Sequence, residues 1–108
     1  MNSKASALVM GVGPEQGLGA ALCKRFAEEQ IQVFVCGRTK DKVNSVCSSI
    51  TNQNGNAVPI VTDVTEIKQV EDMINIIRDS QLPLELAVYN AGNNLPQKFL
   101  DVTADTFT

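Results

Sequence analysis

The sequence predicts an α/β fold, a doubly wound parallel sheet of the β-α-β-α-β-α-β type with helices on both faces. Short apolar segments rich in β-branched residues alternate with longer segments in which apolar residues recur at helical spacing. The connections are short and no internal repeat interrupts this order. Strands that alternate with helices join through right-handed crossovers, which gives strand order 3-2-1-4 in a three-layer αβα arrangement.

The first half of the chain supplies two strands and two helices. Residues 5–12 form a short apolar run that leads into a cluster of glycines, which predicts a buried strand. Residues 17–30 predict an amphipathic helix, and residues 31–37 predict a second buried strand. Thr39 is placed to cap the next helix. The expected buried faces are Leu18, Ala21, Leu22 and Phe26 in the first helix and Val43, Val46, Cys47 and Ile50 in the second.

The second half repeats the alternation. Residues 51–56 (TNQNGN) predict a turn, and residues 57–62 predict a third strand. Pro59 favours an edge position for this strand, because proline cannot donate to the hydrogen-bond ladder. Residues 84–90 predict a fourth strand, and Thr103 is placed to open another helix. The third helix is expected to bury Ile67, Val70, Ile74 and Ile77.

Length and composition indicate one globular domain over residues 1–108. The chain is 44% hydrophobic and 19% charged with a formal net charge of −3, so it lacks the basic surface that duplex nucleic acid requires. Its apolar runs are too short to cross a membrane, and its start lacks a signal-peptide pattern. We therefore expect a cytoplasmic protein with no membrane and no nucleic-acid partner.

The three cysteines argue against a disulfide scaffold and against a metal site. Cys23, Cys36 and Cys47 are widely spaced in apolar segments, and the sequence contains no histidine. We expect all three to be buried, reduced thiols, and we expect no bound metal.

The glycine cluster is the first motif with chemical content. Gly13, Gly17 and Gly19 fall as G-x-x-x-G-x-G between the first strand and the first helix. Glycine there permits a tight turn and a close approach of backbone to a pyrophosphate, which the helix amino terminus then stabilises. No P-loop string occurs, and Gln16 stands where a G-x-G-x-x-G pattern from Gly11 requires its last glycine. The alternative is a glycine-rich turn without a ligand.

The end of the second strand indicates which dinucleotide is bound. Arg38 follows Gly37 directly, with neither Asp nor Glu at the strand end. An acidic residue there meets a free ribose 2′-hydroxyl, whereas arginine accommodates a 2′-phosphate. Thr39, Lys40 and Lys42 can assist Arg38, so NADP(H) is favoured over NAD(H). The alternative is an exposed arginine beside an ordinary helix cap.

Two further spots follow the third and fourth strands. Asp63 can accept a hydrogen bond from an adenine amino group, with the Val64 backbone facing the ring. The alternative for Asp63 is an Asx-type turn before the next helix. Asn90, Ala91 and Gly92 leave space beside a cofactor, and the amide of Asn90 can tie neighbouring strands.

Together the four spots resemble the short-chain dehydrogenase/reductase family, in order and over essentially the whole chain. The resemblance implies a Rossmann fold, binding of NAD(H) or NADP(H), and oxidation or reduction of a small-molecule alcohol or ketone, usually in a homo-oligomer. The chain departs from the family pattern at Val12, at residues 14–16 and at Tyr89. By position, the implied cofactor-binding residues are Gly13, Glu15, Gln16, Gly17, Leu18, Gly19, Arg38, Thr39, Asp63, Val64, Asn90, Ala91 and Gly92.

The family's catalytic serine and Tyr-x-x-x-Lys pair cannot be placed. The one tyrosine, Tyr89, is followed four residues on by Asn93, so no catalytic residue is assigned. We expect the domain to be incomplete at its carboxyl end, as in a truncated product or a gene fragment, and the chain alone to be inactive. An uncovered fourth strand would also present an apolar edge, an aggregation hazard. The alternatives are a non-catalytic fragment that binds nucleotide or pairs with another subunit, and another Rossmann protein such as a methyltransferase.

Overall fold

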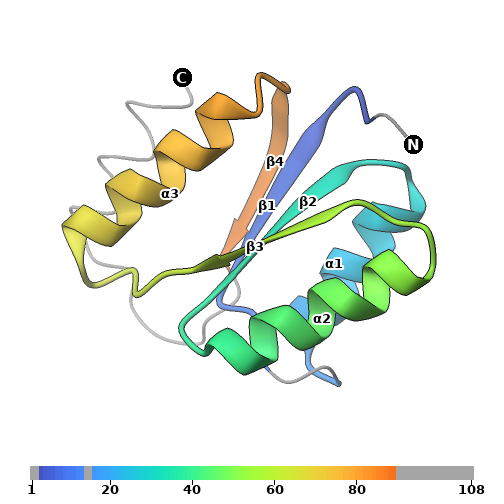
Figure 1. The fold of residues 1–108 in the computed structure, drawn as a ribbon, viewed down its shortest axis with the longest axis horizontal. Coiled ribbons are helices and arrows are strands. Elements are labelled where there is room, and N and C mark those ends of the chain that lie inside the picture. The colour runs from blue at the N-terminus through green and yellow to red at the C-terminus, as the bar shows by residue number, and fades with distance from the viewer. Residues whose placement is uncertain (1–2, 14–15, 90–108) are drawn as a thin grey trace.

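One parallel four-stranded sheet with helices on both faces forms the molecule (Figure 1). The computed structural model describes residues 3–13 and 16–89. The strand order is β3-β2-β1-β4, which confirms the predicted class and topology. The elements are β1 (Ser6–Met10), α1 (Leu18–Glu28), β2 (Gln32–Gly37), α2 (Lys40–Asn52), β3 (Ala57–Val61), α3 (Ile67–Asp79) and β4 (Leu84–Tyr89).

The sheet carries a separate apolar cluster on each face. Helices α1 and α2 cover one face and α3 covers the other (Figure 1). Because side chains alternate along a strand, neighbours such as Leu8 and Val9 enter different clusters. The cluster under α3 contains Leu8, Met10, Phe34, Cys36, Ile60, Val70, Met73, Ile74 and Ile77. The cluster under α1 and α2 contains Val9, Val12, Ala20, Cys23, Val33, Val35, Val43, Val46, Cys47 and Ile50.

The predicted face of α2 is confirmed, that of α3 is confirmed except for Ile67, which is half-buried, and that of α1 is wrong. Helix α2 buries all four expected residues, and α3 buries Met73 with the three expected residues that follow Ile67. In α1, however, Leu18 is 65% exposed, and the residues that face the sheet are small: Gly19, Ala20 and Cys23. Small side chains let the start of α1 lie close to the sheet, so the larger residues turn outward or pack only partly.

The two edges of the sheet differ in character. β3 forms one edge and carries Pro59, as predicted. The C=O of Asn56 accepts from Val33 of β2, and the N–H of Thr62 donates to Gly37 of β2. The backbone N–H and C=O groups of successive residues in a strand point alternately toward one neighbouring strand and the other. Because Asn56 and Thr62 bond to β2, the nitrogen of Pro59 points away from β2, and the proline interrupts no hydrogen bond between the two strands. At the other edge, Leu86 of β4 is 44% exposed.

Each helix ends in a residue with left-handed backbone that is not glycine. These residues are Gln30 after α1, Asn54 after α2 and Gln81 after α3, with φ of 64°, 68° and 60°. Such a residue closes the last helical turn and reverses the chain toward the next strand. The turn predicted over 51–56 starts later, because α2 runs through Asn52.

Burial of the thiols agrees with the sequence. Cys23, Cys36 and Cys47 are buried and free. Burial raises the pKa of Cys23 to about 12 and the pKa of Cys36 and Cys47 to about 11. Across the described part of the chain, no helix has the length and apolar character needed to cross a bilayer.

Candidate dinucleotide-binding edge

The residues singled out by the sequence gather at the carboxyl ends of the strands, the lower part of the sheet in Figure 1. The glycine loop leaves β1, Arg38 follows β2 and Asp63 follows β3. Tyr89, the last residue of β4, is paired in register with Met10, the last residue of β1. In open α/β sheets this edge is where ligands bind, near the point where the strand order reverses.

The glycine loop begins with a backbone that needs glycine. Gly11 has φ of 80°, the left-handed region, and Val12 next donates its N–H to the Cys36 carbonyl at 2.9 Å. Gly13 is different, because a Cβ built on it has no atom within 4 Å in the described structure. Among the described residues, nothing therefore requires glycine at position 13. The space that a side chain would fill holds no atom of residues 3–13 or 16–89.

Helix α1 presents an uncapped amino terminus to this loop. Gly17 is the N-cap residue and has no side chain to cap the helix, no capping side chain is found among the described residues, and the first turn carries no acidic residue. The first N–H groups of a helix have no intrahelical acceptor, and the positive end of the helix dipole favours an anion. Gly19 is buried in this first turn, whereas Gln16 and Leu18 are exposed beside it. These features fit the pyrophosphate of a dinucleotide.

Gly37 holds the ends of β1 and β2 together, and sequence reasoning assigned it no role. A Cβ on Gly37 would overlap the backbone carbonyl oxygen of Val12 and lie 3.0 Å from Cγ2 of Val43. The lack of a side chain thus lets the glycine loop approach the strand end that carries Arg38. The signal available in the sequence was a glycine at the last position of a strand, immediately before the arginine.

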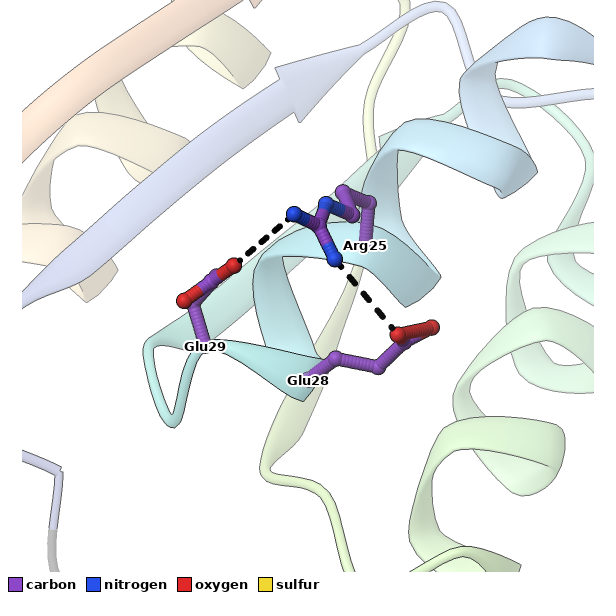
Figure 2. A network of polar contacts seen from close by, with 3 residues as sticks. All are labelled: Arg25, Glu28 and Glu29. Carbon is purple, nitrogen blue, oxygen red and sulfur yellow. Dashed lines mark ion pairs between the residues drawn. The ribbon is translucent and has the colours of Figure 1, made fainter.

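Arg38 is an exposed cation at the end of β2. It forms no ion pair with any residue in 3–13 or 16–89. Arg25 on α1 offers a contrast, because its guanidinium lies 3.8 Å from Glu28 and 3.1 Å from Glu29 (Figure 2). A paired guanidinium has lost donors that a phosphate would use, whereas Arg38 keeps its planar fork.

The start of α2 lies directly after Arg38. Thr39 occupies the N-cap position as predicted, but its hydroxyl makes no capping hydrogen bond. The first N–H groups of α2 are therefore not capped by a side chain. Lys40 and Lys42 are exposed in the first turn, together with Asp41. Arg38, two lysines and an uncapped helix terminus form a locally positive surface.

Asp63 makes the Asx-type turn that the sequence left open as an alternative. Its Oδ1 accepts the Thr65 N–H at 3.0 Å and the Thr65 hydroxyl at 2.7 Å. These hydrogen bonds lower the pKa of the Asp63 carboxyl, and the positive charge of Arg38 lowers it further. The ends of β2 and β3 lie side by side, because Gly37 is paired in register with Val61. Val64 is half-buried against the cluster under α3.

Four of the predicted site residues are not placed by the structure. Glu15 and the segment Asn90, Ala91 and Gly92 lie outside the described residues. The other nine lie at the same edge of the sheet. Across residues 3–13 and 16–89, no cluster of acidic and cysteine residues has the arrangement of a metal site.

A separate pocket lies near the amino ends of β1 and β3, away from the carboxyl ends of the strands. Its volume is about 180 Å³, and Ala27, Ile50 and Asn56 contribute to its lining near the ends of α1 and α2. This pocket contains none of the predicted site residues.

Comparison with known proteins identifies the family of this chain. A family model described as short chain dehydrogenase matches residues 6–108. An uncharacterised oxidoreductase of Staphylococcus aureus is 31% identical over 99 residues, which cover 92% of this chain and 41% of that protein. The chain thus spans about two fifths of the length of that relative.

Solved structures have the same fold. A short-chain type dehydrogenase/reductase from Mycobacterium marinum superposes with a TM-score of 0.78 at 27% identity, covering 97% of this chain and 49% of that one. A metagenomic short-chain oxidoreductase, solved in complex with NADP, superposes with a TM-score of 0.76 at 22% identity, covering 84% and 40%. Since the family model matches nearly the whole chain, this protein belongs to the short-chain dehydrogenase/reductase family.

Proposed function

We propose that this chain is the NADP(H)-binding half of an oxidoreductase that transfers hydride between a nicotinamide and a small-molecule alcohol or ketone. The observation that carries the proposal is Arg38, a guanidinium without an ion-pair partner among the described residues, beside an uncapped α2 terminus. It shares its sheet edge with the open position at Gly13. The NADP bound to the metagenomic neighbour supports the same cofactor.

Each group at the edge would have a distinct task toward the dinucleotide. The open loop at Gly13, Gly17 and the uncapped start of α1 would hold the pyrophosphate. Arg38 and Thr39 would hold the 2′-phosphate, as a planar fork and a hydroxyl that makes no capping bond. The nicotinamide supplies the hydride chemistry when bound.

Further residues belong to the proposed site. Asp63 and Val64 would meet the adenine, while Gln16 and Leu18 flank the loop. Glu15 and the segment Asn90, Ala91 and Gly92 remain part of the proposal by family resemblance.

The chain itself is proposed to bind without turnover. Its single tyrosine, Tyr89, is followed four residues on by Asn93, so the sequence holds no Tyr-x-x-x-Lys. This observation also favours the second candidate, a non-catalytic fragment that binds nucleotide or pairs with another subunit. We further propose that the full-length enzyme is a homo-oligomer and that it is cytoplasmic. The three free, buried thiols support the cytoplasmic location.

A titration with NADPH and NADH tests the choice of cofactor. We expect the chain to bind NADPH more tightly, and Arg38→Gln to weaken NADPH binding by about 10- to 100-fold while leaving NADH unchanged, the size of a lost charge-assisted hydrogen bond. Arg78→Gln is the matched control, because Arg78 is an exposed arginine in the last turn of α3. Equal binding of the two nicotinamides, or preferential binding of S-adenosylmethionine, would contradict the proposal.

A further inference from the structure

Four hydrogen bonds of Asp63 hold the turn between β3 and α3. The Asp63 N–H donates to Oε1 of Gln69 at 2.8 Å, and the Asp63 C=O accepts the Glu66 N–H at 3.0 Å. Thr65 donates twice to Asp63 Oδ1. Both backbone groups of Asp63 and one of its carboxylate oxygens thus have partners within six residues.

Gln69 makes an unusual contact for its position in α3. With Glu66 as N-cap, Gln69 is the third helical residue, where a glutamine commonly reaches back to the N-cap N–H. Here its amide oxygen passes the N-cap and accepts the N–H of Asp63, six residues earlier. Gln69 is exposed, so this contact does not serve the apolar core. The side chain instead fixes the backbone of the residue that follows the end of β3 by two positions.

The remaining acceptor of Asp63 is its second carboxylate oxygen. Thr65 takes Oδ1, and no hydrogen bond within 3–13 and 16–89 uses Oδ2. Because the lowered pKa keeps the group ionised at neutral pH, Oδ2 can only accept a hydrogen bond. It therefore suits a ligand that presents a donor, such as the 6-amino group of adenine. It disfavours a base that presents a 6-oxo group at the same place.

We propose that Gln69 is a positioning residue for base recognition: by accepting the Asp63 N–H, it sets the Asp63 carboxylate so that Oδ2 meets a 6-amino purine and rejects a 6-oxo purine. Thr65 completes the arrangement by fixing the rotation of the carboxylate through Oδ1. The inference rests on the proposed dinucleotide site, since the base reaches Asp63 only when the pyrophosphate lies at the glycine loop.

The test compares two dinucleotides that differ only at the base. Binding of NADPH and of its hypoxanthine analogue to the 108-residue chain is measured through nicotinamide fluorescence. We expect the unaltered chain to prefer NADPH. We expect Gln69→Ala to reduce that preference by about 3- to 10-fold, the size of one hydrogen bond, by weakening NADPH alone. A purely structural role would weaken both dinucleotides equally, and that result would overturn the proposal.

Two further variants separate the alternatives. Gln69→Glu keeps an acceptor for the Asp63 N–H, so it should retain the preference for NADPH even if added charge weakens both ligands. Lys68→Ala removes only the exposed ion pair between Lys68 and Asp72, 2.7 Å long and on the same helix. It should leave the dissociation constants of both dinucleotides unchanged. An unchanged preference in Gln69→Ala refutes the role of Gln69 alone. Failure of the unaltered chain to bind either dinucleotide refutes the proposed function, and the positioning role with it.

Discussion

Replacing Gly37 by alanine should disturb the molecule where β1 and β2 end. The added Cβ would overlap the Val12 carbonyl oxygen and approach Cγ2 of Val43 to 3.0 Å. The Val43 side chain can move by a few tenths of an ångström, but the oxygen belongs to the backbone. Val12 is further held by its hydrogen bond to Cys36, so relief requires the end of β1 to separate from β2.

The loss of stability in Gly37→Ala depends on which atom the new Cβ overlaps. Overpacking a filled site costs about 1–3 kcal/mol, and a clash with fixed backbone belongs at the upper end of that range. A loss of about 3 kcal/mol is a large share of the stability of a small domain, typically 5–15 kcal/mol. With a urea m-value of about 1.5 kcal/mol/M, we expect the unfolding midpoint of Gly37→Ala to fall by about 2 M.

Gly13→Ala is the matched control, because it is the same chemical change two residues into the loop. A Cβ at position 13 meets no atom of the described residues within 4 Å, so we expect the free energy of unfolding to change by less than about 0.5 kcal/mol. That same Cβ would occupy the space proposed for the pyrophosphate, so NADPH binding should be lost. Urea unfolding and an NADPH titration on both variants are the assays. Equal destabilisation by the two substitutions would refute the geometric reasoning.

Two other predictions concern stability. Burial raises the pKa of Cys23 and Cys36 from 9.0 to about 12 and 11, so between pH 9 and 11 these thiols ionise mainly in the unfolded chain. The free energy of unfolding should therefore fall as pH rises through this window, by up to about 1.4 kcal/mol per pH unit and thiol, in urea titrations at pH 9, 10 and 11; a flat profile would contradict it. Gln81→Gly should raise the free energy of unfolding by about 1 kcal/mol, because glycine adopts φ of 60° without strain. Gln53→Gly, at φ of −103°, should instead lower it, and thermal unfolding that ranks the two in the opposite order would be inconsistent with this account.

The order of elements was predictable because each signal is local. Alternation of apolar segments set the topology, and Pro59 correctly indicated an edge strand. The buried face of α2 was predictable because all of its apolar residues lie on one side of the helix. The buried face of α1 was not predictable, since a sequence pattern assigns large apolar residues such as Leu18 to the buried side. The distance between helix and sheet, which selects Gly19 and Ala20 instead, depends on the tertiary structure.

Within the site, residue types were predictable and contacts were not. Arg38 and Asp63 follow strand ends, so the sequence could place both at one edge of the sheet. The absence of a Thr39 cap bond depends on backbone angles that a pattern does not encode. The contact between Gln69 and Asp63 depends on how α3 enters after the turn. The role of Gly37 depends on the approach of Val12 from another strand.

The Pro59 nitrogen makes the two edge strands of the sheet unequal as partners for a further strand. A strand that approached the outer side of β3 would find a missing donor at the centre of the edge, where alternate residues of β3 face outward. β4 has no such block: it carries no proline between Leu84 and Tyr89, and Leu86 offers exposed apolar surface beside it. We therefore expect an additional strand, whether from the same polypeptide or another molecule, to pair with β4 rather than with β3. Among residues 3–13 and 16–89, β4 pairs with β1 alone, so no strand of this described part covers its outer side.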